Sequence, residues 1–277
     1  MSNRVLLGTY RLLSFLVIPG FIREKHYREN LVRLERTDWD FWTGHENYIE
    51  NQSEWGDIRF GVGKRQSMAY AGCEIMATYN ARKALGEKLS RQDMAELICS
   101  YEARGAALFG KFGVAPTAVA AYFRKQGFCV ETTDGRNREA VERIAENAAV
   151  MIVTAYNDKN DITAQIHTVC VTRNRNGDYL LHNAYRRDAK GRYTESAPYG
   201  SLQEAVTHIS GGESKLIYLI GIAAAVRNAF GEYHIFNTTS TKNSVSLLEA
   251  CSEPPYFSAA AAMAVSPSPS PLCFVER

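Results

Sequence analysis

The chain has 277 residues, of which 45% are hydrophobic and 22% charged, and this is enough to bury a substantial core in one large domain. The formal net charge is only +2, and basic and acidic residues are mixed along most of the chain, which argues against a nucleic-acid-binding protein. Six cysteines stand at wide intervals without a CxxC pair, which argues against a zinc ribbon or a thioredoxin-like motif, and free thiols in a reducing, cytoplasmic compartment are expected.

The N-terminal stretch VLLGTYRLLSFLVIPGFI (residues 5–22) is apolar but is interrupted by Arg11 and by Pro19-Gly20. Its longest uninterrupted run, residues 12–18, is shorter than the ~20 residues that span a bilayer, and a poor signal-peptidase site follows it. We expect a helix packed on the domain, with weak membrane-surface contact or an atypical export signal as alternatives. The rest of residues 1–54 is charged and aromatic and predicts a helical lead-in followed by a loop.

The next segment predicts three helices. The first is expected to start at Ser67, where apolar residues begin to recur at helical spacing. The second starts after Ser90, a natural N-cap, with Asp93 where a capping box has Glu or Gln. In the third, Pro116 fits the first turn and Gly127 the end.

Period-two and β-branched segments predict strands in the second half of the chain. Helices first and an antiparallel sheet afterwards make an α+β arrangement. The expected domain covers residues 55–225, and residues 226–277, rich in Ser, Thr, Ala and Pro, are expected to be disordered or loosely packed. The expected strands are 128–133, 149–156, 166–173, 178–185 and 215–224, with helices at 137–149 and 201–209.

Cys73 directly follows Gly72 at what the pattern predicts to be the first turn of a helix. Unpaired backbone N–H groups and the positive end of the helix dipole favour the thiolate, which is the reactive form of cysteine. A lone cysteine in a helix is usually a core residue, however. The catalytic interpretation therefore requires a histidine beside Cys73 and a polar residue that orients it.

His167 is the candidate histidine because it begins an otherwise apolar strand, and Asn183 follows it sixteen residues later. A two-residue loop at Asn176-Gly177 would turn Asn183 away from His167. A three-residue loop, Arg175 to Gly177, with Gly177 in the left-handed region, would place Asn183 diagonally next to His167 on one face. The catalytic interpretation requires the three-residue loop.

The order Cys, His, Asn resembles that of the papain-like cysteine peptidases, and the chain is most similar to the bacterial C39-like peptidase domains. The resemblance covers about Gly56 to Ile222 and implies a papain-like fold, in which a helical first half carries the nucleophile and packs on an antiparallel sheet carrying His and Asn. With no transporter region, the chain looks like a stand-alone relative. The matching segments are QSMAYAGCEIMATYNA, FGVAPTAVAAYFRKQGFCV and IHTVCVTRNRNGDYLLHNAY.

This resemblance implies roles for four residues. Cys73 becomes the nucleophile, His167 the general base and acid, Asn183 the orienting residue, and Gln66 the oxyanion-hole donor together with the Cys73 N–H. The implied substrate is a peptide or another amide, and no metal or organic cofactor is implied. Each residue also has a purely structural interpretation, as a core thiol, a buried histidine, a strand-end amide and a loop amide.

Three functions are therefore compared. The first is a cysteine-dependent hydrolase that works through an acyl-enzyme. The second is an acyltransferase or transglutaminase-like enzyme with the same nucleophile, in which an amine or alcohol takes the acyl group. The third is a non-catalytic binding module, in which the same residues serve only as packing.

Overall fold

A five-stranded antiparallel sheet forms the centre of the protein, with strand order β1-β7-β2-β3-β4. The computed structural model describes residues 2–38, 48–63, 66–156, 166–187, 189–209, 214–223, 225–227 and 233–235. The sheet strands are β1 (Cys129–Thr133), β2 (Val150–Tyr156), β3 (Ile166–Arg173), β4 (Tyr179–His182) and β7 (Lys215–Ala223). Two short pairs lie outside the sheet, β5 (Arg186–Arg187) with β6 (Tyr193–Thr194) and β8 (Ala225–Arg227) with β9 (Tyr233–Ile235).

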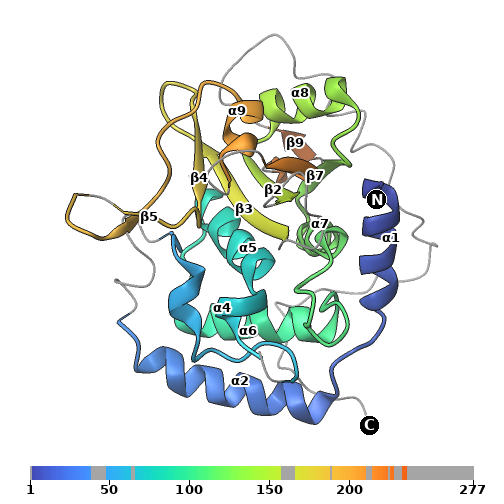
Figure 1. Ribbon diagram of the computed structural model, residues 1–277, viewed down its shortest axis with the longest axis vertical. Coiled ribbons are helices and arrows are strands. Elements are labelled where there is room, and N and C mark those ends of the chain that lie inside the picture. The colour runs from blue at the N-terminus through green and yellow to red at the C-terminus, as the bar shows by residue number, and fades with distance from the viewer. Residues whose placement is uncertain are drawn as a thin grey trace.

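Helices cover both faces of this sheet, which makes the molecule an α+β protein as predicted (Figure 1). Alternate residues of each strand face the two sides, so two apolar clusters form, one on each face. One face of the sheet is covered by α4, α5, α6 and α7, and the other face by α8 and α9. The bounds are α4 (Met68–Ala71), α5 (Cys73–Ala84), α6 (Arg91–Ala103), α7 (Pro116–Lys125), α8 (Arg138–Asn147) and α9 (Leu202–Thr207).

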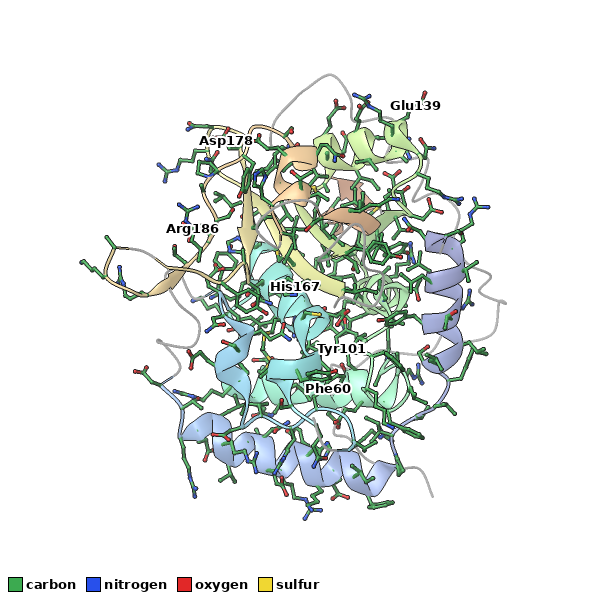
Figure 2. The ribbon with its side chains drawn as sticks, in the orientation of Figure 1. Phe60, Tyr101, Glu139, His167, Asp178 and Arg186 are labelled. Carbon is green, nitrogen blue, oxygen red and sulfur yellow. The ribbon has the colours of Figure 1, made fainter. Side chains whose placement is uncertain are left out.

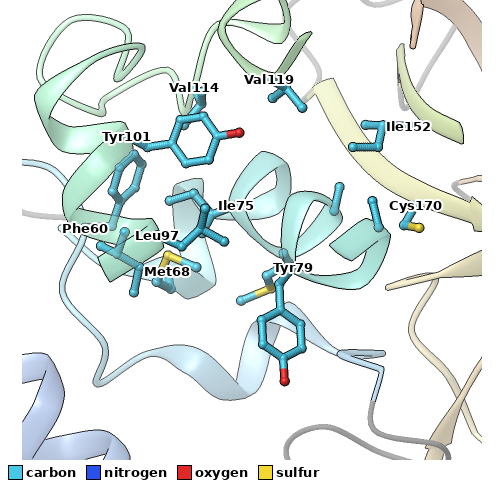
Figure 3. Packing of buried hydrophobic residues seen from close by; sticks show 14 of the residues in the cluster. Phe60, Met68, Ile75, Tyr79, Leu97, Tyr101, Val114, Val119, Ile152 and Cys170 are labelled. Carbon is cyan, nitrogen blue, oxygen red and sulfur yellow. The ribbon is translucent and has the colours of Figure 1, made fainter. Parts of the chain in front are cut away.

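The larger core lies between α5 and the sheet. Figure 3 shows Ile75 of α5 among side chains of the helical layer, with Ile152 and Cys170 on the strands beside the same helix. All three side chains are inaccessible to solvent. Burial of these apolar surfaces holds α5, and with it Cys73, against β2 and β3.

Local sequence signals explain where two of the helices begin. The α6 helix starts after Ser90, whose Oγ accepts from the Asp93 N–H at 3.2 Å while Asp93 Oδ2 accepts from the Ser90 N–H at 2.7 Å. This is the predicted capping box, with Asp93 in the position that Glu or Gln usually occupies. The α7 helix begins with Pro116, and Gly127 follows it with φ of 87°. Both predictions are confirmed.

The helix expected from Ser67 is interrupted at Gly72, so two helices, α4 and α5, replace it. A Cβ atom on Gly72 would lie 2.6 Å from the Met68 carbonyl oxygen, which leaves room for glycine only. The break gives α5 its own N-terminus, and Cys73 is its first residue.

The β3–β4 hairpin has the three-residue loop that the catalytic interpretation requires. Cys170 pairs with His182, and the Asn174 N–H donates to the Asp178 carbonyl at 2.9 Å. Residues 175–177 form the loop, and Gly177 has φ of 89°. The left-handed conformation of Gly177 closes this loop and sets the register of β4.

The N-terminal helices α1 (Asn3–Leu13) and α2 (Gly20–Glu35) pack on the same core. The Asn3 amide donates to the Asp134 and Leu216 carbonyls at 2.8 and 3.1 Å, which anchors α1 across the sheet edge. None of the helices in the described ranges is both long and apolar enough to cross a membrane. Apart from β8 and β9, the predicted loose tail (226–277) lies outside the described residues.

Candidate active site

Cys73 is the first residue of α5, and its side chain is only 7% exposed. Its Sγ donates a hydrogen bond to Glu74 Oε2 at 3.2 Å. Burial raises the pKa of the Cys73 thiol well above its usual value and the negative charge of Glu74 raises it further, whereas backbone hydrogen bonds from Thr168 and Glu74 act in the opposite direction. The helix N-terminus alone predicted a thiolate; burial and Glu74 instead favour the neutral thiol in this arrangement.

Glu74 is a buried carboxylate directly after Cys73. Its Oε1 accepts from the Thr168 hydroxyl at 3.2 Å, and its Oε2 accepts from the Val114 N–H at 3.4 Å. Burial raises the pKa of Glu74 to about 7, while these hydrogen bonds lower it. Glu74 is not among the predicted site residues, although a lone acidic residue inside the apolar segment CEIMA is a signal that the sequence carries.

His167 lies at the start of β3 and is buried, and Figure 2 shows it in the interior while Asp178 and Arg186 lie at the periphery. Its Nε2 is 2.9 Å from the backbone carbonyl oxygen of Asn183. Because a carbonyl only accepts, Nε2 carries the proton and Nδ1 is left as an acceptor. Burial lowers the pKa of His167, so the imidazole is neutral near pH 7.

Asn183 orients His167 through its backbone and not through its carboxamide. The Asn183 side chain accepts from the Gln52 N–H at 2.9 Å and donates to Gln52 Oε1 at 3.3 Å. Asn183 has φ of 70°, in the left-handed region that Asn tolerates, at the point where β4 has ended. This conformation turns the amide toward Gln52 and leaves the carbonyl for His167.

A strap of chain, residues 48–52, holds this end of the hairpin and was not predicted. Both backbone groups of Ile49 bond to the Asn80 amide, at 2.8 and 2.9 Å. Glu50 bonds to His182 Nδ1 at 2.6 Å and to the Asn183 N–H at 2.8 Å. No spacing rule connects residues so far apart in the chain, so these contacts could not be predicted from the sequence.

Tyr185 covers one face of the His167 ring. Its ring stacks on the His167 ring with centroids 5.5 Å apart and an interplanar angle of 21°. Partial burial raises the pKa of Tyr185, although the residue is still 45% exposed, and the charge of Cys73 acts in the same direction. Tyr185 therefore separates part of the His167 imidazole from solvent.

Two of the expected contacts are not formed between described residues. No hydrogen bond joins Cys73 to His167: the thiol bonds to Glu74, and the imidazole to Asn183. Gln66 is half-buried just before α4 and makes no hydrogen bond to Cys73 or His167 in the part of the chain that the structure describes. The structure thus brings together Cys73, Glu74, Thr168, His167, Tyr185 and Asn183.

The cysteines differ from one another in their bonding. Cys73 and Cys170 are free thiols, as expected. Cys99 and Cys129 are disulfide-bonded, so the expectation of free thiols is wrong for these two, and the cysteine argument for a reducing compartment no longer applies. In the described ranges, no three His, Cys, Asp or Glu side chains are grouped so that they would hold a metal ion.

Comparison of the chain with protein-family models, with curated proteins and with solved structures finds no match.

Proposed function

We propose that the protein is a papain-like, cysteine-dependent hydrolase that cleaves a peptide or amide bond. The observation that carries this proposal is the position of Thr168, the residue directly after His167. Its hydroxyl donates to Glu74, the residue directly after Cys73. This contact holds the start of β3 against the start of α5, so the two residues proposed to react lie on neighbouring elements, which proton transfer between them requires.

The tautomer of His167 also supports this function. With Nε2–H donated to the Asn183 carbonyl, the Nδ1 lone pair is available to accept the Cys73 proton. The backbone carbonyl performs the orienting role that the resemblance assigned to the Asn183 carboxamide. The strap that holds Asn183 makes this acceptor rigid.

The reaction proceeds in two stages. His167 Nδ1 takes the Sγ proton, the sulfur forms a bond to the substrate carbonyl carbon, the carbon–nitrogen bond breaks, and the imidazolium gives its proton to the leaving amine. Water then attacks the thioester with His167 as base, which releases the carboxylic acid and restores the thiol. In this mechanism the Cys73 backbone N–H, at the start of α5, stabilises the oxyanion, and Gln66 is the proposed second donor.

The test is alkylation of the full chain by iodoacetamide between pH 5 and 9, with the modified residue identified by peptide mass. We expect Cys73 to be the fast-reacting thiol and His167→Ala to slow it at least tenfold near pH 7. Cys170→Ala is the matched control, because it removes a second buried free thiol away from His167. Equal rates in the wild type and His167→Ala would rule out the dyad.

A non-catalytic binding module is the second candidate, favoured by the neutral, buried state of Cys73. It predicts that Cys73 and Cys170 react equally slowly. Hydrolase and acyltransferase differ only in the group that accepts the acyl chain, so release of acid or of amide from an acylated Cys73, with and without an added amine, distinguishes them.

A further inference from the structure

We propose that Glu74 is a positioning residue, which holds the Cys73 thiol away from His167 in the resting protein. The active dyad then forms when Sγ rotates about the Cα–Cβ bond from Glu74 Oε2 toward His167 Nδ1. This inference rests on the proposed hydrolase function and adds a resting state to it.

The carboxylate is the fixed partner of this hydrogen bond, and the thiol is the movable one. Glu74 is held on both oxygens, by the Thr168 hydroxyl at 3.2 Å and by the Val114 N–H at 3.4 Å. Gly113 packs closely against it, since a Cβ there would lie 3.0 Å from Glu74 Oε2. The thiol donates one hydrogen bond, to Glu74, and only the rotation about its Cα–Cβ bond has to change for that bond to break.

The surroundings of Glu74 contain no described cation that would favour a second negative charge on Cys73. The titratable groups of described residues that interact electrostatically with the pair are tyrosines, and burial leaves His167 neutral near pH 7. A thiolate beside the ionised carboxylate is therefore disfavoured until Sγ moves to the imidazole. These tyrosines are Tyr10 of α1, Tyr101 of α6 and Tyr185 after β4.

Activation consists of one proton transfer. The Sγ proton leaves its hydrogen bond to Glu74 and passes to His167 Nδ1, which produces the thiolate and the imidazolium. Glu74 keeps its bonds to Thr168 and Val114 and loses one hydrogen bond. No oxidant, metal or further reactant takes part.

Glu74→Gln tests the inference in the same alkylation assay, because glutamine keeps the shape of the side chain and removes its charge. We expect the pH midpoint of Cys73 labelling to fall by about one unit, which corresponds to about tenfold faster labelling at pH 7. An unchanged midpoint, or slower labelling, would overturn the proposal.

Glu102→Gln is the matched control, since Glu102 is another buried carboxylate that accepts a backbone N–H and bonds to a histidine, His26, at 2.7 Å. It should leave the labelling midpoint unchanged. If Glu74→Gln does not fold, Glu74→Met provides the second variant, because it replaces the carboxylate by an apolar group of similar length and should also accelerate labelling.

The two proposals fail in different ways. If Glu74→Gln accelerates labelling and His167→Ala has no effect, then Glu74 controls the thiol but the hydrolase proposal fails. If His167→Ala slows labelling and Glu74→Gln has no effect, the hydrolase proposal stands and the role of Glu74 is refuted.

A separate observation concerns the corner between α1 and α2, from which we infer a docking site for an anionic lipid surface. Large apolar side chains project from it, with Leu12 68%, Phe15 72% and Phe21 75% exposed. The corner is not loose: Arg23 Nε donates to the Ile18 carbonyl at 3.1 Å, and the Leu108 N–H donates to the Leu13 carbonyl at 2.9 Å.

The charges around this corner indicate which kind of partner would bind there. Residues 2–23 contain three arginines and no acidic residue, and the first acidic residue, Glu24, is paired with Arg28. Arg4 lies at the far end of α1 and is paired with Asp134, so Arg11 and Arg23 are the arginines that flank the corner. An apolar surface bordered by arginines matches an anionic headgroup layer, whereas a second copy of the chain would bring the same positive charge against it.

Flotation of the full chain with vesicles of phosphatidylcholine, with and without phosphatidylglycerol, tests this inference. We expect binding only when the anionic lipid is present and at least tenfold weaker binding by the Phe15→Ser/Phe21→Ser double variant. Val32→Ser, which changes an exposed apolar residue farther along α2, is the control and should bind normally. Absence of binding, equal binding to both vesicles, or a dimer that the double variant dissociates would refute the lipid site.

Discussion

The Thr168 hydroxyl donates to Glu74 Oε1 over 3.2 Å, and this contact joins the start of β3 to the first turn of α5. Thr168 also lies 3.0 Å from the Thr154 hydroxyl on β2, so its side chain connects two strands and a helix inside the core. Because His167 and Cys73 are the residues immediately before Thr168 and Glu74, the contact determines their relative position.

Removal of this contact should weaken both the fold and the site. Thr168→Val leaves two buried polar groups, on Glu74 and Thr154, with one partner fewer, and we expect a loss of about 1–3 kcal/mol in the free energy of unfolding. Urea denaturation measures it. Thr207→Val removes a hydroxyl at the exposed end of α9 and should change the unfolding free energy by less than about 0.5 kcal/mol. Equal losses in the two variants would contradict the importance of the contact.

Glu74 should make stability depend on pH. Its pKa is about 7 in the folded protein against 4.5 for the unfolded chain, so between these values the folded state binds more protons and stability falls as pH rises. The full difference is about 3 kcal/mol. His167, whose pKa is lowered, acts oppositely and destabilises the fold as pH falls below its unfolded value.

The comparison of wild type with Glu74→Gln isolates the contribution of Glu74. Unfolding free energies measured from pH 4 to 8 should show the variant gaining on the wild type as pH rises through that interval. A constant difference across the whole range would show that Glu74 does not titrate there.

Asn183→Gly separates the carbonyl of Asn183 from its amide. Glycine accepts the φ of 70° and keeps the carbonyl that His167 bonds to, but it removes both bonds to Gln52. We expect a loss of about 1–3 kcal/mol in the free energy of unfolding and a rate of Cys73 alkylation within a few-fold of the wild type. A rate as low as that of His167→Ala would show that the carboxamide orients the imidazole after all.

Gly72→Ala should destabilise the start of α5. The added Cβ would lie 2.6 Å from the Met68 carbonyl oxygen, a backbone atom that cannot move aside, and the expected loss in the free energy of unfolding is about 1–3 kcal/mol. Gly56→Ala is the control, because its Cβ would have no neighbour within 4 Å. Thermal unfolding of both variants should show a lower midpoint for Gly72→Ala only.

Local signals allowed much of the fold to be predicted. Three of these signals act within a few residues of the chain, so their structural effect can be predicted from the sequence. They are the capping box of Ser90 and Asp93, the proline at the start of α7 and the glycine of the β3–β4 loop. The loop also determines the register of β4 and hence the approach of Asn183 to His167. Cys73 at a helix start was likewise predicted, although only Gly72 explains why a new helix begins there.

The tertiary structure decided the chemistry of the candidate site. Whether a carboxylate next to Cys73 is solvated or buried depends on β3 and on the loop at Val114, and neither is adjacent to it in the chain. Which group of Asn183 bonds to His167, the backbone carbonyl or the side-chain amide, depends on the strap of residues 48–52. This strap lies more than a hundred residues earlier in the chain. Periodicity tells which face of an element is apolar, but the pKa of a group and its hydrogen-bond partners depend on what folding brings against it.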